Sequence, residues 1–86
     1  MRLLWEESTW ADYNYWQTQD KKTLKRNNSL IKDIQRDPFA GTGKSEPLKG
    51  NLRGYWSRRI DEVHRLVYKI ESDMLIIASC RGHYEN

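Results

Sequence analysis

The chain has 86 residues and a hydrophobic fraction of 37%, which is enough for one small core and too little for two, so we expect a single domain over residues 1–86. Its mean hydropathy is −0.96 and its longest apolar run covers only residues 74–80; with acids following "MRLLW" too early for a secretory signal, we predict a cytoplasmic protein without membrane contact. The net charge is +3, with the basic excess after residue 20, which fits a polyanionic partner as well as a merely solvated basic surface.

A short strand and a helix are predicted at the start of the chain. The run "RLLW" contains three consecutive apolar residues, Leu3, Leu4 and Trp5, and is typical of a short strand. In "STWADYNYWQTQ", Trp10, Tyr13 and Trp16 recur at helical spacing. We therefore expect a helix here, with its aromatic stripe in the core.

A second helix is expected over "KKTLKRNNSLIKDIQR", with Asp20 as its N-cap. Asp37 and Pro38 end it, because the residue before a proline disfavours helical backbone. Asn27 lies inside the apolar face of this helix, so either its side chain is hydrogen-bonded or the apolar face is narrower at this point. The apolar face consists of Leu24, Leu30, Ile31 and Ile34.

The second half of the chain is predicted to be a loop followed by three strands. The stretch "PFAGTGKSEPLKGNLRG" is rich in turn residues and long for a small domain, which is typical of a functional loop. The runs "RGYWSRRI", "HRLVYKIE" and "MLIIASCRGHY" resemble strands, with turn signals at residues 61–62 and 72–73. Short connections favour antiparallel pairing. We expect an α+β fold with two N-terminal helices packed on one side of a mostly antiparallel four-stranded sheet.

The alternation of side chains along a strand predicts which residues share a face. In "RLVYKIE", Leu66 and the alternate residues after it are expected to face the helices, so Arg65 points away from them. In the last strand the same rule groups His83 with Leu75, unless a bulge at Gly82 redirects the end. His83 is therefore a candidate neighbour of Arg65 on the uncovered face.

Glu46, Arg65 and His83 supply the groups needed to cleave a phosphodiester without a metal. In RNA the 2′-hydroxyl attacks the adjacent phosphorus, so the protein must accept a proton, stabilise charge and protonate the leaving oxygen. Glu46 is the candidate base, Arg65 the charge stabiliser and His83 the acid. Taken singly, His83 is better explained as a terminal histidine without a function and Glu46 as a solvated loop acid, so from spacing alone ribonuclease is one interpretation among several.

Other catalytic chemistries have less support in the sequence. His64 and His83 are the only histidines, and no Cys-x-x-Cys or Gly-x-Ser-x-Gly motif is present, so no metal or cofactor is predicted. Cys80 lies in an apolar run and is expected to be an inert buried thiol. His64 is interpreted as a residue at the start of a strand. The tryptophans are assigned to the core, although Trp56 and Tyr84 offer rings on which a base can stack.

The string "GKSEPLKGNLRGYWSRRIDEVHRLVY", with "LLWEESTWADYNYWQ" and the terminal "CRGHY", strongly resembles the YoeB toxins of the RelE superfamily. The match runs nearly end to end. The resemblance implies a curved RelE-like sheet and a small cytoplasmic endoribonuclease of a bacterial type II toxin-antitoxin module. Such enzymes enter the ribosomal A site, against rRNA, and cut the exposed mRNA codon. The resemblance also implies a YefM-like antitoxin that covers the active site, and a toxin able to form homodimers.

Carried over by position, the resemblance implies that Glu46, Arg65, His83 and Tyr84 are catalytic. It implies contacts with RNA or the ribosome for Lys44, Lys49, Arg53, Arg58 and Arg59.

The chain departs from the family pattern in three places. Ser45 stands where proline is usual, Asn27 replaces an apolar helix residue, and Glu85 and Asn86 extend past the usual final tyrosine. Two other functions stay open beside the endonuclease. One is a non-catalytic interaction toxin on the same scaffold, as in the ParE toxins that poison gyrase; the other is a general basic RNA-binding module, whose binding would depend on salt without cleavage.

Overall fold

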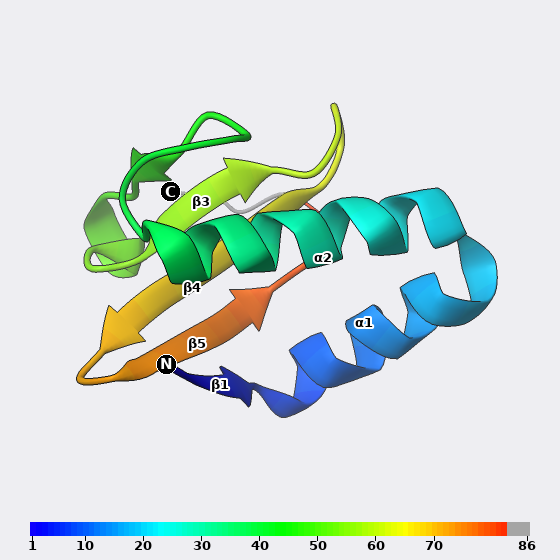
Figure 1. Ribbon diagram of the computed structural model, residues 1–86, viewed down its shortest axis with the longest axis horizontal. Coiled ribbons are helices and arrows are strands. Elements are labelled where there is room, and N and C mark those ends of the chain that lie inside the picture. The colour runs from blue at the N-terminus through cyan, green and yellow to red at the C-terminus, as the bar shows by residue number, and fades with distance from the viewer. Residues whose placement is uncertain (83–86) are drawn as a thin grey trace.

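The computed structural model describes residues 1–82, in which α1 and α2 cover one face of a five-stranded sheet (Figure 1). In this view α2 runs across the front of the sheet, and α1 follows β1 at the edge. The predicted α+β class is confirmed. The elements in chain order are β1 (Arg2–Trp5), α1 (Glu7–Gln19), α2 (Lys21–Arg36), β2 (Glu46–Pro47), a 3-10 helix (Gly50–Leu52), β3 (Trp56–Arg59), β4 (Arg65–Glu71) and β5 (Met74–Ser79).

The strands are arranged in the order β1-β5-β4-β3-β2. β1 runs parallel to β5 and the other pairs are antiparallel, so the sheet is mostly antiparallel as predicted. The predicted count of four strands was wrong, because β2 pairs Glu46 with Ser57 and Pro47 with Trp56. A strand of two residues shows no alternation, and it lies in a stretch dominated by turn residues.

The helix α2 begins and packs as its sequence predicts. The Asp20 carboxylate accepts a hydrogen bond from the Thr23 backbone N–H at 3.1 Å, which confirms it as the N-cap. Leu30 and Ile34 have no exposed surface. Burial of these side chains against the sheet stabilises the helix more than its intrinsic helix propensity does. The core consists of Trp16, Leu30, Ile31, Ile34, Ile60, Leu66, Tyr68, Leu75, Ile77 and Cys80.

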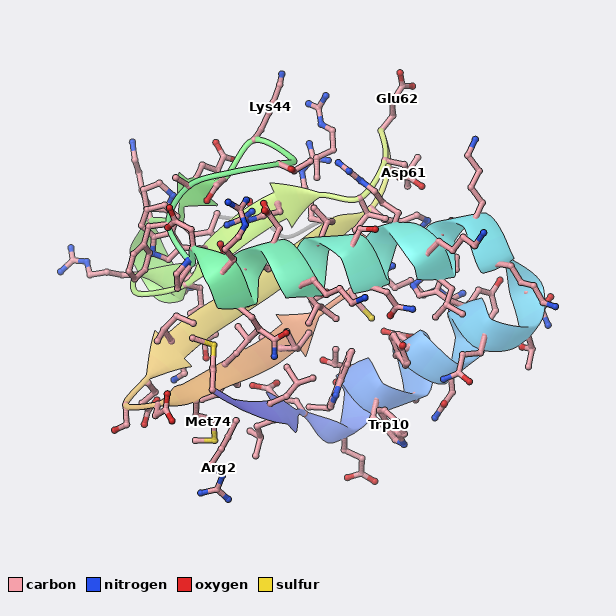
Figure 2. All side chains as sticks on the ribbon, in the orientation of Figure 1. Arg2, Trp10, Lys44, Asp61, Glu62 and Met74 are labelled. Atoms are coloured by element: carbon pink, nitrogen blue, oxygen red, sulfur yellow. The ribbon has the colours of Figure 1, made fainter. Side chains whose placement is uncertain are left out.

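The aromatic stripe of α1 is only partly in the core. Trp16 is 5% exposed and packs in the core, whereas Trp10 is 47% exposed, so the prediction was wrong for Trp10. The Trp10 ring instead contacts the rings of Trp5 at 5.6 Å and Tyr13 at 5.8 Å. Because α1 leaves directly from the edge strand β1, its first turn lies beside the sheet and not over it; Figure 2 shows Trp10 at this margin.

Asn27 and Cys80 are a polar and a potentially reactive side chain buried inside the protein. Asn27 is fully buried and its Nδ2 donates to the Thr23 carbonyl at 2.9 Å. The expected hydrogen bond is therefore confirmed for the amide nitrogen, whereas Oδ1 is buried without a partner among the described residues. Cys80 is also fully buried. Burial, with a smaller contribution from the Asp12 carboxylate, raises the pKa of its thiol to about 12, so the thiolate is absent at neutral pH.

A β-bulge at Ala78 changes the faces at the end of β5. Val67 pairs with Ser79 and Tyr68 with Ile77, which leaves Ala78 as an extra residue. Strict alternation along this strand would place Ser79 on the face of Leu75, but the extra residue moves Ser79 to the face of Val67. The grouping of His83 with Leu75 relied on the same alternation, and His83 itself lies outside the described residues.

The Arg58 guanidinium is fully buried and connects α2, the sheet and the loop after α2. Its Nη1 lies 2.6 Å from Asp33 Oδ2 and its Nε donates to the Tyr68 hydroxyl at 3.2 Å. The other donors bond loop carbonyl oxygens: Nη1 bonds Thr42 at 3.3 Å, and Nη2 bonds Asp37 at 2.7 Å and Ala40 at 3.0 Å. Residues 37–42, which lead to β2, are therefore fixed to the core.

Replacing Arg58 by methionine should destabilise the protein by about 3–5 kcal/mol. The substitution removes the cation of a buried ion pair with Asp33 and leaves the loop carbonyls of Asp37 and Ala40 without their donor. Urea unfolding at pH 7 measures the loss. Arg53→Met is the matched control, since Arg53 is exposed and its loss should change stability by no more than about 0.5 kcal/mol. Equal unfolding midpoints for the two variants would contradict the assignment.

Acid should weaken the fold through Asp33. Hydrogen bonds from the Arg36 side chain, the Thr42 N–H and Arg58 hold the pKa of the Asp33 carboxyl well below its usual range. A carboxyl with a lowered folded pKa stabilises the fold above its unfolded pKa of about 3.9, and that stabilisation is lost as pH falls below this value. The urea midpoint of the wild type should therefore drop more between pH 5 and pH 2 than that of Asp33→Asn. An equal decrease of the urea midpoint in both proteins would contradict this role of Asp33.

Candidate active site

Strands β2, β3 and β4 bring the predicted site residues onto the sheet face away from the helices. Glu46 pairs with Ser57, Ser57 with Val67, and Arg59 with Arg65. Residues directly opposite one another in antiparallel strands point to the same face, and the residues between them point into the core. Glu46, Arg59 and Arg65 therefore share one surface. The prediction that Arg65 points away from the helices is confirmed.

The register also sets how far apart these groups are. Neighbouring strands lie about 4.8 Å apart and two residues advance about 6.8 Å along a strand. Glu46 is two strands and two residues away from Arg65, which places their Cα atoms about 12 Å apart. A glutamate and an arginine side chain extending toward each other can span this distance, so both are long enough to reach a phosphate group lying above the sheet between them.

The centre of this surface is buried and its margins carry charge. Ser57 is 1% and Val67 is 3% exposed, whereas Glu46 is exposed and Arg59 and Arg65 are half-buried. Hydrogen bonds and charge interactions are stronger where water is excluded. Arg59 and Arg65 would therefore interact more strongly with an anion held beside this buried centre than with one in bulk water.

Arg59 and Arg65 form a cross-strand pair of like charges. Such a direct pair is unfavourable without a counter-ion. Among the salt bridges within residues 1–82, none joins either arginine to a carboxylate. Arg65 Nη1 donates to the Asp61 carbonyl at 3.2 Å, and the Arg59 Nε is buried without a hydrogen-bond partner. Two guanidinium groups in this state suit a phosphate, whose oxygens each accept several hydrogen bonds.

The remaining basic residues of the predicted set divide into one structural residue and three surface residues. The prediction that Arg58 contacts RNA was wrong, because its guanidinium is fully buried and hydrogen-bonded within the protein. Lys44, Lys49 and Arg53 are exposed around β2, and Figure 2 shows Lys44 extending away from the loop. Their contacts with RNA stay predictions.

His83 and Tyr84 lie outside the described residues, but the chain leading to them is fixed. The Arg65 backbone N–H donates to the Gly82 carbonyl at 3.0 Å, and the Gly82 N–H donates to His64 Nδ1 at 2.7 Å. The strand that carries Arg65 therefore also holds the residue before His83. The sequence interpretation of His64 as only a strand-start residue missed this contact, for which its position next to Arg65 was the one available signal.

Two other kinds of site were sought in the part of the chain that the structure describes. No cluster of three or more His, Cys, Asp or Glu residues there has the geometry to hold a metal ion. Neither α1 nor α2, the helices of that part, is long and apolar enough to cross a membrane.

Comparison with known proteins agrees with the resemblance seen in the sequence. The family model of the YoeB-like toxin of bacterial type II toxin-antitoxin systems matches residues 5–84. Toxin YoeB of Escherichia coli K12 is 60% identical over 98% of this chain and 100% of its own length. A YoeB/ParE toxin from Agrobacterium tumefaciens superposes with a TM-score of 0.96 at 48% identity, covering 98% of this chain and 100% of that one.

YoeB from Staphylococcus aureus has been solved as a dimer and in a heterotetrameric complex with YefM. Both structures have TM-scores of 0.91 at 45% identity and cover 98% of each chain. A family match over nearly the whole length, high identity and a common fold lead to one conclusion. The chain belongs to the YoeB-like toxins of bacterial type II toxin-antitoxin systems.

Proposed function

We propose that this toxin is an endoribonuclease that cleaves mRNA in the ribosomal A site, acting in the cytoplasm as a single domain over residues 1–86. The observation that carries the proposal is the strand register that puts Glu46, Arg59 and Arg65 on one face of the sheet. This set offers a proton acceptor and two phosphate-binding groups. Family membership supplies the substrate class, and no metal or cofactor is required by the chemistry below.

The proposed reaction is an internal transesterification of RNA. Glu46 accepts the proton of the 2′-hydroxyl as its oxygen bonds to phosphorus, and Arg65 stabilises the charge that develops on the phosphate oxygens. The bond from phosphorus to the 5′-oxygen breaks, and His83 protonates that oxygen, with Tyr84 beside it in the sequence as a further phosphate or base contact. The products are a 2′,3′-cyclic phosphate and a 5′-hydroxyl, so protons and bonds balance without an external reactant.

The basic residues would bind RNA in two places, at the scissile phosphate and along the backbone around the site. Arg59 supports Arg65 at the scissile phosphate. Lys44, Lys49 and Arg53 surround β2 and face solvent, where they would contact the mRNA or rRNA backbone. Contacts of this kind add affinity without sequence preference and weaken as salt increases.

A protein partner is proposed from the relatives. The Staphylococcus aureus relative forms a complex with YefM and is also found as a dimer. We infer that a YefM-like antitoxin binds and neutralises this chain, and that the chain can form a homodimer. An antitoxin segment lying over Glu46 and the arginine pair would exclude RNA, and acidic residues in it would place negative charge beside the two arginines.

Replacing Glu46 by glutamine should reduce cleavage of A-site mRNA by about 100- to 10,000-fold, because Gln keeps the shape of the side chain but accepts no proton. Primer extension on programmed ribosomes measures the rate. Glu62→Gln is the control, since Glu62 is an exposed acid in the 61–63 turn (Figure 2). Uncut mRNA with folded wild-type protein would reject the proposal.

Toxicity that survives His83→Gln would favour a non-catalytic toxin, and salt-dependent RNA binding without cleavage would favour a general binding module.

Inorganic phosphate should stabilise the protein through the arginine pair. A ligand that binds only the folded state raises its stability as concentration increases. The melting temperature of the wild type should therefore increase with phosphate at constant ionic strength, and Arg65→Gln should lose most of that increase. Arg53→Gln controls for general charge, because Arg53 is exposed and outside the pair. An equal response of all three proteins would show that no phosphate site exists there.

A further inference from the structure

The chain just before residue 83 is held by side chains from α1. Trp16 Nε1 donates to the Cys80 carbonyl at 2.9 Å. The Arg81 guanidinium lies 3.7 Å from the centre of the Tyr15 ring, and its Nη1 lies 3.5 Å from Asp12 Oδ1. A segment at the end of a chain is usually poorly ordered unless it is tied down. Cys80 and Arg81 are tied down by neighbours far away in the sequence.

Gly82 is held at both of its backbone groups by two consecutive residues. Its N–H donates to His64 Nδ1 at 2.7 Å, and its carbonyl accepts from the Arg65 N–H at 3.0 Å. A backbone N–H can only donate, so Nδ1 carries no proton and the neutral ring is protonated at Nε2. The imidazole of His64 thus takes the place of a strand carbonyl and extends the pairing of β4 to Gly82.

The His64 ring is itself fixed in orientation. It meets Trp16 edge-on, with ring centres 4.9 Å apart and an angle of 73° between the planes. The His64 backbone N–H donates to Asp61 Oδ1 at 2.6 Å. Because packing fixes the ring and a hydrogen bond fixes the backbone, the acceptor at Nδ1 has a defined position relative to Arg65.

We propose that His64 is a positioning residue that fixes Gly82, the residue before His83 in the sequence, relative to Arg65. This inference rests on the proposed function, in which Arg65 and His83 act on one phosphate. His83 directly follows Gly82 in the sequence, so a shift at Gly82 is passed to the acid through a single peptide unit. A misplacement of about 1 Å can cost about 100-fold in rate. His64 acts through Gly82 and needs no contact with substrate.

Two substitutions separate positioning from packing. His64→Phe keeps a ring against Trp16 and removes the acceptor, whereas His64→Asn places a side-chain oxygen near the position of Nδ1 and removes the ring. Positioning predicts the order wild type, then His64→Asn, then His64→Phe for kcat on ribosomes. For His64→Phe we expect a loss of about 10- to 100-fold in kcat with KM within about twofold, because the arginine pair is untouched. A packing role predicts the reverse order of the variants, and that result would overturn the proposal.

Hydrogen exchange at the Gly82 amide gives a readout that does not depend on activity. It should be about tenfold faster in His64→Phe, which lacks the acceptor, and close to the wild-type rate in His64→Asn. Nitrogen-15 spectra of the wild type at pH 8 should show Nδ1 of His64 as the unprotonated ring nitrogen, which requires no variant to fold. Unchanged exchange in His64→Phe, or a proton on Nδ1, would overturn the inference. Wild-type protein that fails to cut mRNA would instead refute the proposed function, while the exchange rates still decide whether His64 holds Gly82.

Discussion

Five hydrogen-bonding contacts converge on the buried guanidinium of Arg58, and the placement of Glu46 depends on them. A buried cation is costly unless every donor is paired. Here the partners come from α2 through Asp33, from β4 through Tyr68, and from the loop that leads to β2. Because that loop has little apolar surface of its own, hydrogen bonds from Arg58 attach it to the core in place of the hydrophobic contacts that hold the helices. The candidate base therefore stands on a strand of only two residues and still has a defined register.

The two faces of the sheet follow different physical rules. The face under the helices is stabilised by burial of apolar side chains, and the one thiol there, Cys80, is buried and unreactive. The other face accepts an unfavourable pair of guanidinium groups, Arg59 and Arg65, beside a buried centre. Like charges in cross-strand register cost stability unless a counter-ion lies beside them, and such conflicts with local rules are expected at functional sites. The pair therefore favours an anionic ligand on this surface, which is the basis for the RNA cleavage and antitoxin binding proposed above.

The bulge at Ala78 and the anchoring of Gly82 act together at the end of β5. The extra residue rotates the chain so that Cys80 enters the core and Ser79 joins the face of Val67. The residues that follow are then held by α1 and by His64, next to Arg65. A terminal segment that looks unconstrained in the sequence is thus fixed up to the residue before His83, which is where precision is needed if the terminal residues take part in catalysis.

Local patterns in the sequence were sufficient for the helices, their cap and most of the sheet. The period of the apolar residues in α2, the capping carboxylate of Asp20 and the alternation around Leu66 are set by neighbours in the chain, so they can be predicted without tertiary contacts. The resemblance to YoeB toxins added the family and the candidate residues. Tertiary structure alone decided that Arg58 is structural, that Glu46 lies on a fifth strand, that Ala78 is a bulge and that His64 holds Gly82. Each of these depends on contacts between residues distant in sequence, and composition and spacing carry no information about such contacts.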